Sequence, residues 1–153
     1  MAGLFSCPSI YVKKVEAKGK TYTISPNKIP KSVKKSSAYN KNTRNSLQIQ
    51  YYLKKLQKGG GRLVLKKGTY KICSTLFVPS NTTIELKEGA VLKKINKGKS
   101  NYKPTKNMFL LCSYKNRNKT NAYKKFNGPK NIKFIGHGSK SVIDLSYIKG
   151  AHG

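Results

Sequence analysis

Four side chains could supply a carboxylate for acid–base or metal chemistry, and they are Glu16, Glu85, Glu88 and Asp144. A glycosidase of the two-carboxylate type would have to draw both members of its pair from these four residues. A calcium or magnesium site needs several oxygen ligands, usually with two or more carboxylates among them, and this chain cannot supply a dense cluster. The sequence therefore predicts no metal site and no cofactor, and we do not expect this chain alone to be an active enzyme.

Cysteine and histidine complete the inventory of reactive side chains: Cys7, Cys73, Cys112, His137 and His152. No two cysteines stand in a CxxC or CxxxC pair, so a structural zinc site is not expected. We interpret Cys73 and Cys112 as small, buried apolar residues. The alternative is a disulfide between these two residues, if the chain is secreted.

The strongest chemical signal is positive charge. The chain has 153 residues, room for one domain, and its 33 Lys and Arg against 4 Asp and Glu give a formal charge of +29. Repulsion on this scale destabilises a compact state unless anions screen it. We therefore expect the partner of this protein to be a polyanion.

A basic segment at residues 97–129 combines lysines with tyrosines and asparagines. Cations beside aromatic rings suit single-stranded nucleic acid or the sugar rings of a charged polymer. The alternative is a solvated loop that binds nothing. The sequence contains no RNP motif, zinc finger or helix-turn-helix pattern. The candidate substrate-binding residues in this segment are Lys115, Arg117, Lys119, Tyr123, Lys124 and Lys125.

Residues 1–17 could be a degenerate export signal. The stretch from Ala2 to Val12 is uncharged, is too short to span a bilayer, and has the length of the apolar region of a signal peptide. Residues 15–17 resemble a small-residue cleavage site, but the usual basic residues before the apolar run are missing. A plain N-terminal arm is the alternative. We expect no transmembrane segment and a location outside the cell or at its surface.

The elements that must position these side chains begin after a polar leader. Residues 18–42 are mostly Lys, Ser and Asn with two prolines, which predicts a disordered basic leader. Thr43 offers a helix cap, and residues 44–58 contain neither Gly nor Pro and repeat apolar residues at spacings near three and four. The sequence predicts one amphipathic helix here, ended by Gly59-Gly60-Gly61.

After the three glycines the pattern changes to short apolar runs separated by turn residues. Strands this brief suit a coil in which each turn of chain lays one strand beside the strand before it. The expected strands are 63–65, 69–73, 74–78, 83–86, 91–95, 131–136 and 141–145.

This series of elements resembles the opening of the right-handed parallel β-helix proteins of the pectate lyase and polygalacturonase-like superfamily. The resemblance covers residues 43–145 and implies a mainly β domain over 43–153 with about three coils and one N-terminal capping helix, interrupted by the basic insertion at 97–129. Family members are normally twice this length or more, so the resemblance implies the N-terminal portion of such a protein. The residues that carry it are Leu63-Val64-Leu65, Gly68-Thr69-Tyr70, Leu76 to Ile84, Glu88 to Leu92, Asn131 to Gly138 and Val142 to Asp144.

The β-helix frame assigns further roles. The helix at 44–58 would cover the strand edges and the apolar end of the first coil. Gly68, Asn81 and Gly89 would lie at corners that require a tight bend or a positive φ. The residues expected to stack inward are Leu63, Leu65, Ile72, Leu76, Val78, Ile84, Leu86, Val91, Ile132, Phe134 and Ile143.

The resemblance does not transfer catalytic residues. Gly136-His137-Gly138-Ser139 is similar to the Gly-His-Gly loop of polygalacturonases, but no paired aspartates precede it, and we interpret it as a corner between two strands. We interpret Asp144 as a turn residue that bonds its own backbone rather than as a lone catalytic carboxylate. Pectate lyases combine a calcium-binding Asp cluster with a basic Arg, and no acidic cluster accompanies any arginine of this chain.

The resemblance implies binding, or former processing, of an acidic polysaccharide at the cell surface. If a full-length relative is active, a polysaccharide lyase or a glycoside hydrolase is implied. The alternative is sequence-independent binding of a polyanion such as nucleic acid, driven by counterion release. An uncapped C-terminal end would also be a template for strand addition by another chain.

Overall fold

The computed structural model describes residues 19–120, 123 and 127–148. The described chain is mainly β, with one long helix, α2 (Arg44–Leu56), a short helix α1 (Lys31–Lys34) and a 3-10 turn η2 (Tyr114–Asn116). Within these residues no helix is both long and apolar enough to cross a membrane. The strands are β1 (Lys20–Ile24), β2 (Gly61–Leu65), β3 (Gly68–Ile72), β4 (Leu76–Val78), β5 (Thr82–Leu86), β6 (Ala90–Lys94), β7 (Phe109–Leu111), β8 (Ile132–Gly136) and β9 (Val142–Asp144).

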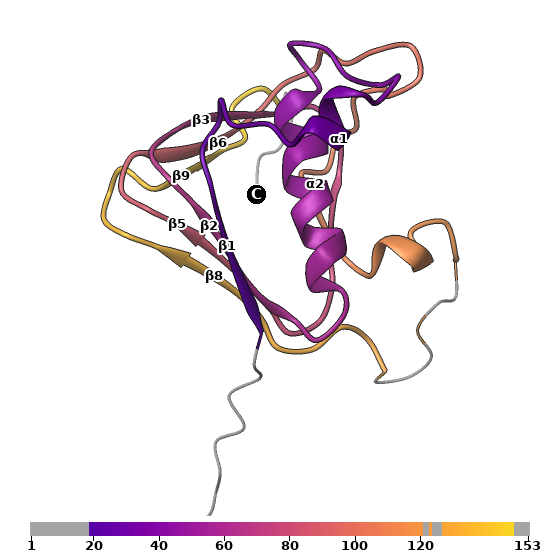
Figure 1. Cartoon of the computed structure of the whole chain (residues 1–153), viewed down its shortest axis with the longest axis vertical. Coiled ribbons are helices and arrows are strands. Elements are labelled where there is room, and N and C mark those ends of the chain that lie inside the picture. Colours follow the sequence, from indigo (N-terminus) through magenta and orange to yellow (C-terminus); the bar gives the residue numbers. More distant parts are fainter. Residues whose placement is uncertain (1–18, 121–122, 124–126, 149–153) are drawn as a thin grey trace, which may run out of the picture.

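The strands form three parallel sheets, in the orders β1-β2-β5-β8, β3-β6-β9 and β4-β7. The first two strands, β1 and β2, are neighbours in the first sheet. From β2 onward, consecutive strands of the chain enter different sheets, and each of the strands β5 to β9 pairs with the strand three before it. In Figure 1 the first sheet and the second sheet form two sides around the core, and α2 lies along the third side. The prediction of a mainly β fold is confirmed, and its strands are parallel.

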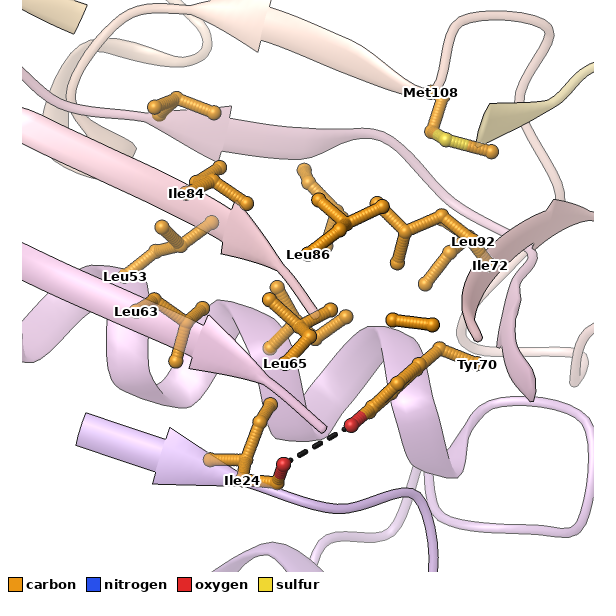
Figure 2. Close-up of a cluster of buried hydrophobic side chains, with 14 of the residues drawn as sticks. Ile24, Leu53, Leu63, Leu65, Tyr70, Ile72, Ile84, Leu86, Leu92 and Met108 are labelled. Carbon is orange, nitrogen blue, oxygen red and sulfur yellow. Dashed lines mark hydrogen bonds between the residues drawn. The ribbon is translucent and has the colours of Figure 1, made fainter. Parts of the chain in front are cut away.

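The core lies between the three sheets and α2. The register places Leu63 beside Ile84 and Leu65 beside Leu86, so apolar residues stack from strand to strand. Leu53 enters the same cluster from α2, and the hydroxyl of Tyr70 donates to the carbonyl of Ile24 (Figure 2). Each fully buried side chain of this size stabilises the fold by about 1.5–3 kcal/mol.

Most of the predicted inward positions are confirmed, because seven of them are buried: Leu63, Leu65, Ile72, Leu76, Val78, Ile84 and Leu86. Val91 is a wrong prediction. The register pairs Gly68 with Ala90 and Tyr70 with Leu92, and both Ala90 and Leu92 are buried. Val91 lies between them and faces the opposite side of the sheet, where it is only half-buried. Ile132 is half-buried, while Phe134 and Ile143 are each 42% exposed on the last strands of their sheets.

The helix α2 confirms the expected amphipathic helix, and it contributes more than an apolar stripe. Leu53 and Leu56 are fully buried against the sheets. Gln50 carries a polar function at the same interface, because its side-chain amide accepts from the N–H of Phe77 at 2.8 Å and donates to the carbonyl of Phe77 at 3.3 Å. Gln50 thus gives β4 the pair of hydrogen bonds that a neighbouring strand would otherwise supply. Thr43 stands at the N-cap position, but its hydroxyl donates to the carbonyl of Ala38 instead of capping the helix.

The prediction of a disordered leader is wrong, and the segment expected as an insertion contains a strand. The expected disordered leader at 18–42 contains β1, which pairs with β2, and α1, whose Val33 is buried. A strand forms there because Tyr22 and Ile24 face inward and extend the apolar stacks of β2. The expected insertion at 97–129 contains β7, which pairs in parallel with β4 and supplies another strand of the third sheet. The possible signal segment at 1–17 lies outside the described residues.

The glycines after α2 are required by close backbone contacts. Gly60 has φ 72° and Gly61 has φ 141°. A Cβ atom at Gly60 would collide with the carbonyl oxygen of Asn81, and one at Gly61 would collide with that of Lys20. The predicted corners are also confirmed, because Gly68, Asn81 and Gly89 have φ values of 134°, 59° and 82°.

Candidate polyanion-binding surface

Cations and tyrosines gather where α2 meets the η2 turn. The Lys54 ammonium lies 3.8 Å from the centroid of the Tyr114 ring, and the Arg117 guanidinium lies 3.9 Å from the same centroid. Lys55 is the next residue of α2 after Lys54, and its ammonium lies 4.6 Å from the centroid of the Tyr51 ring. We call Tyr51, Lys54, Lys55, Tyr114 and Arg117 the cation–tyrosine surface; Figure 1 shows η2, in orange, beside the helix.

The η2 half of this surface is held by the third sheet. The Tyr114 ring packs edge-on against Phe77 of β4, with centroids 5.8 Å apart. The Arg117 side chain donates a hydrogen bond of 2.9 Å to the carbonyl of Tyr114. The fold therefore holds the guanidinium and the ring in one arrangement before any ligand arrives.

The α2 half is held by a tyrosine–lysine pair at helical spacing. A hydrogen bond with Lys55, followed in size by one with Ser32, lowers the pKa of Tyr51. The same bond with Tyr51 raises the pKa of Lys55, which is opposed by a smaller effect of burial. Lys55 therefore stays positively charged throughout the physiological pH range.

A cavity of about 220 Å³ opens beside the cation–tyrosine surface. Its lining combines aromatic rings, hydroxyl groups and the Lys54 side chain, and includes Tyr51, Tyr102, Tyr114, Ser32 and Ser36. Burial raises the pKa of Tyr102, which keeps its phenol protonated and able to donate. Drug-sized ligands occupy cavities of roughly 300–1,000 Å³, so this cavity has room for about one ring.

The structure brings together only part of the predicted substrate-binding set. Arg117 belongs to the cation–tyrosine surface, whereas Lys115 and Lys119 are exposed nearby in sequence. Tyr123 is half-buried, and its hydroxyl accepts from the N–H of Ser113. Lys124 and Lys125 lie outside the described residues.

The environment of Tyr123 changes its acidity. Burial alone would raise the pKa of Tyr123, but hydrogen bonds with the backbone of Ser113 and with the side chains of Asn116 and Ser113 outweigh burial and lower it. Tyr123 therefore fastens the chain after η2 rather than offering a free ring edge to a ligand.

Lys54, Lys55 and Tyr51 were missed by the sequence reasoning. Their spacing of three and four residues places tyrosine and lysine on one exposed helix face, and this signal could have identified the pair at 51 and 55. No spacing connects Lys54 with Tyr114, because the fold alone brings these two positions together.

A second charged cluster surrounds Glu85 on β5. Its carboxylate contacts Arg62 at 2.7 Å, His137 at 2.6 Å and Lys87 at 3.1 Å, and its side chain is 8% exposed. The hydrogen bond from Arg62, followed by that from Lys87, lowers the pKa of Glu85 to about 2. Both oxygens of this carboxylate are thus engaged by cations, which suits a structural role better than proton transfer.

The two interpretations of the last strands are confirmed. His137 lies at the corner between β8 and β9, where its N–H donates to the hydroxyl of Ser141. The carboxylate of Asp144 accepts from the N–H of Ser146 at 2.9 Å, as a turn residue does. Hydrogen bonds from the Ser146 side chain and backbone lower the pKa of Asp144.

The cysteines carry no cross-link in the described structure. Cys73 and Cys112 are both buried free thiols, so the interpretation as buried apolar residues is confirmed and the alternative disulfide is wrong. Across residues 19–120, 123 and 127–148, no three His, Cys, Asp or Glu side chains gather as metal ligands would.

Comparison of the chain with family models, with curated proteins and with solved structures finds no match. The resemblance to the pectate lyase and polygalacturonase-like superfamily therefore rests on the sequence motifs.

Proposed function

We propose that the three parallel sheets are the faces of a right-handed parallel β-helix of the pectate lyase-like kind, and that the chain binds an acidic polysaccharide through its cation–tyrosine surface. The order of the strands supports the first part, because the chain passes through β2, β3 and β4 and then through β5, β6 and β7, adding one strand to each sheet per turn. The helix α2 occupies the position that a capping helix would have, beside β3 and β4.

One observation carries the binding proposal: two cations, Lys54 and Arg117, are fixed on the ring of Tyr114 beside a cavity sized for one ring. Acidic sugars combine a flat, weakly polar ring with a carboxylate. The rings of Tyr51 and Tyr102, which line the cavity, suit the sugar face, and the cations fixed on Tyr114 suit the carboxylate. Because the groups are already in place, little ordering free energy is lost on binding.

A polysaccharide fits this surface better than nucleic acid does. Base stacking needs an open aromatic face, and the Tyr114 ring is already in contact with two cations. Binding fits better than processing, because Glu85 is fully engaged by Arg62, Lys87 and His137. An acidic polymer of this kind would be met outside the cell or at its surface.

The test is a binding titration with labelled polygalacturonate, wall teichoic acid and single-stranded DNA across a salt series. We expect polygalacturonate to bind at physiological salt, and the double variant Lys54→Ala/Arg117→Ala to bind about tenfold more weakly or worse. The matched control is Lys20→Ala/Lys133→Ala, which removes the same charge from exposed positions on the first sheet. Binding of DNA alone, or an equal loss in the control, would contradict the proposal.

A further inference from the structure

A second and larger cavity lies away from the cation–tyrosine surface. It measures about 1,200 Å³, is lined by residues 94–96, 104–107 and 146–148, and shares no lining residue with the smaller cavity. Its lining contains two lysines, Lys94 and Lys106, and no Asp or Glu. The charge of this lining therefore favours an anion.

Lys94 holds an unusual position in the fold. The register places it beside Ile72, at an inward position of β6, and the residue is only 2% exposed. An ammonium group at an apolar position costs free energy unless it has partners. The Lys94 ammonium donates to the carbonyl of Cys73 and, at 3.4 Å, to the carbonyl of Ile95.

These two acceptors leave the ammonium group with spare capacity. An ammonium carries three N–H donors, and the hydrogen bonds within the described residues use two of them. Burial also lowers the pKa of Lys94, opposed by the neighbouring Cys73 thiol, which means that the charged form is under-stabilised. An oxyanion next to this group would supply the third acceptor and offset the loss of water.

We propose that this cavity is a subsite for a small oxyanion, a carboxylate or a phosphate group, held by the Lys94 ammonium. Asn96, Asn107 and Ser146 line the same cavity and carry further donors for the ligand. The subsite does not rest on the proposed polysaccharide function, because a phosphate from another source would fit the same chemistry.

The adjacent residue provides a matched control. Lys93 is exposed, and the register places it beside Asp144 on the outer side of the second sheet. Its side chain points away from the inward position of Lys94, since successive residues of a strand face opposite sides. A ligand in the cavity should therefore affect Lys94 and leave Lys93 unchanged.

The first experiment uses the wild-type full chain. Because Lys94 is only 2% exposed, its slow acylation through local opening of the fold is followed over hours by mass spectrometry of peptides. Sodium galacturonate, inorganic phosphate or uncharged galactose is present at equal ionic strength. We expect galacturonate, phosphate or both to slow acylation of Lys94 several-fold, with no change at Lys93 and none with galactose. Protection by only one anion identifies which oxyanion the subsite prefers.

The second experiment compares calorimetric titrations of Lys94→Met and Lys93→Met with the anion that protects. We expect about tenfold weaker binding for Lys94→Met and unchanged binding for Lys93→Met. If Lys94→Met does not fold, the wild-type protection experiment decides by itself. Equal protection of both lysines, or no protection by either anion, would overturn the proposal.

Discussion

The two edges of the sheet stack are finished in different ways. At one edge, α2 covers β3 and β4 and bonds to their backbones. At the other edge, the last strands β7, β8 and β9 expose large apolar side chains, including Leu111 at 49%, Phe134 at 42% and Ile143 at 42%. The strands are alike in length and pairing, so the difference lies in what covers them.

The covered edge shows how a helix can replace a missing strand. Gln50 bonds to both backbone groups of Phe77, Asn45 accepts from the N–H of Lys71, and Ser46 accepts from the N–H of Cys73. Strand edges left open can pair with other chains. Here the polar side chains of α2 form the hydrogen bonds that such a chain would otherwise form. At the exposed edge, strand addition by another chain stays a prediction.

The largest expected difference between the two edges is the stability lost when a large apolar side chain is shortened to alanine. Leu53→Ala at the covered edge should lower the free energy of unfolding by about 2–5 kcal/mol, because it leaves a cavity in the core. Ile143→Ala at the exposed edge should lower it by about 1 kcal/mol or less, because its side chain is already in contact with water. Urea denaturation measures both values, and equal losses would contradict the comparison.

The next effect tests the polar bonds of the covered edge. Gln50→Ala should lower the free energy of unfolding by about 1–3 kcal/mol, because the N–H and carbonyl of Phe77 lose their partner beneath the helix. Gln57→Ala, at the exposed end of the same helix, is the control and should change it by about 0.5 kcal/mol or less. A Gln50 variant as stable as its control would show that α2 acts through its apolar face alone.

A smaller effect concerns the charged cluster that ties the β8–β9 corner to β5. The pKa of Glu85 falls from its ordinary value of 4.5 to about 2 in the fold, so its stabilisation is complete above pH 4.5 and is lost as the pH falls toward 2. Glu85→Gln should cost about 1–2 kcal/mol at pH 7 and flatten this part of the stability curve. Thermal unfolding of the wild type and of Glu85→Gln between pH 2 and pH 7 measures this dependence. If the variant loses as much stability as the wild type between pH 4.5 and pH 2, Glu85 does not have this role.

The smallest expected change in stability comes from placing charged side chains on the exposed edge. Phe134→Lys/Ile143→Lys should change the free energy of unfolding by about 1 kcal/mol or less but should reduce self-association, because charged side chains on an edge oppose strand addition. Sedimentation velocity of the variant and the wild type measures the association. A wild type that stays monomeric at high concentration would refute strand addition between copies of this chain.

The regular elements could be predicted because their patterns are local. The helix predicted at 44–58 is found at 44–56, and the expected strands after it are found with shifts of one or two residues. The strand at 20–24 was missed although Tyr22 and Ile24 alternate with polar residues, because this run is short and lies within a long polar segment. The strand β7 depends on β4, which lies about thirty residues earlier in the chain.

The candidate site was predictable only in part, for the same reason. Arg117 stands in the basic segment for which we expected anion binding from the composition. Lys54 lies on a helix more than fifty residues earlier and reaches Tyr114 only because α2 packs on β4, where Phe77 supports the Tyr114 ring. Buried Gln50 was missed as well, because its role exists only once β4 lies beneath the helix.

The most direct test of the proposed function is a hydrogen-exchange footprint of the wild-type chain with and without polygalacturonate at physiological salt. We expect slower exchange in the second half of α2 and in the segment around residues 114–117, with no change in β8 and β9. Protection confined to β8 and β9, or no protection at the cation–tyrosine surface when the polymer is bound, would contradict the proposed function.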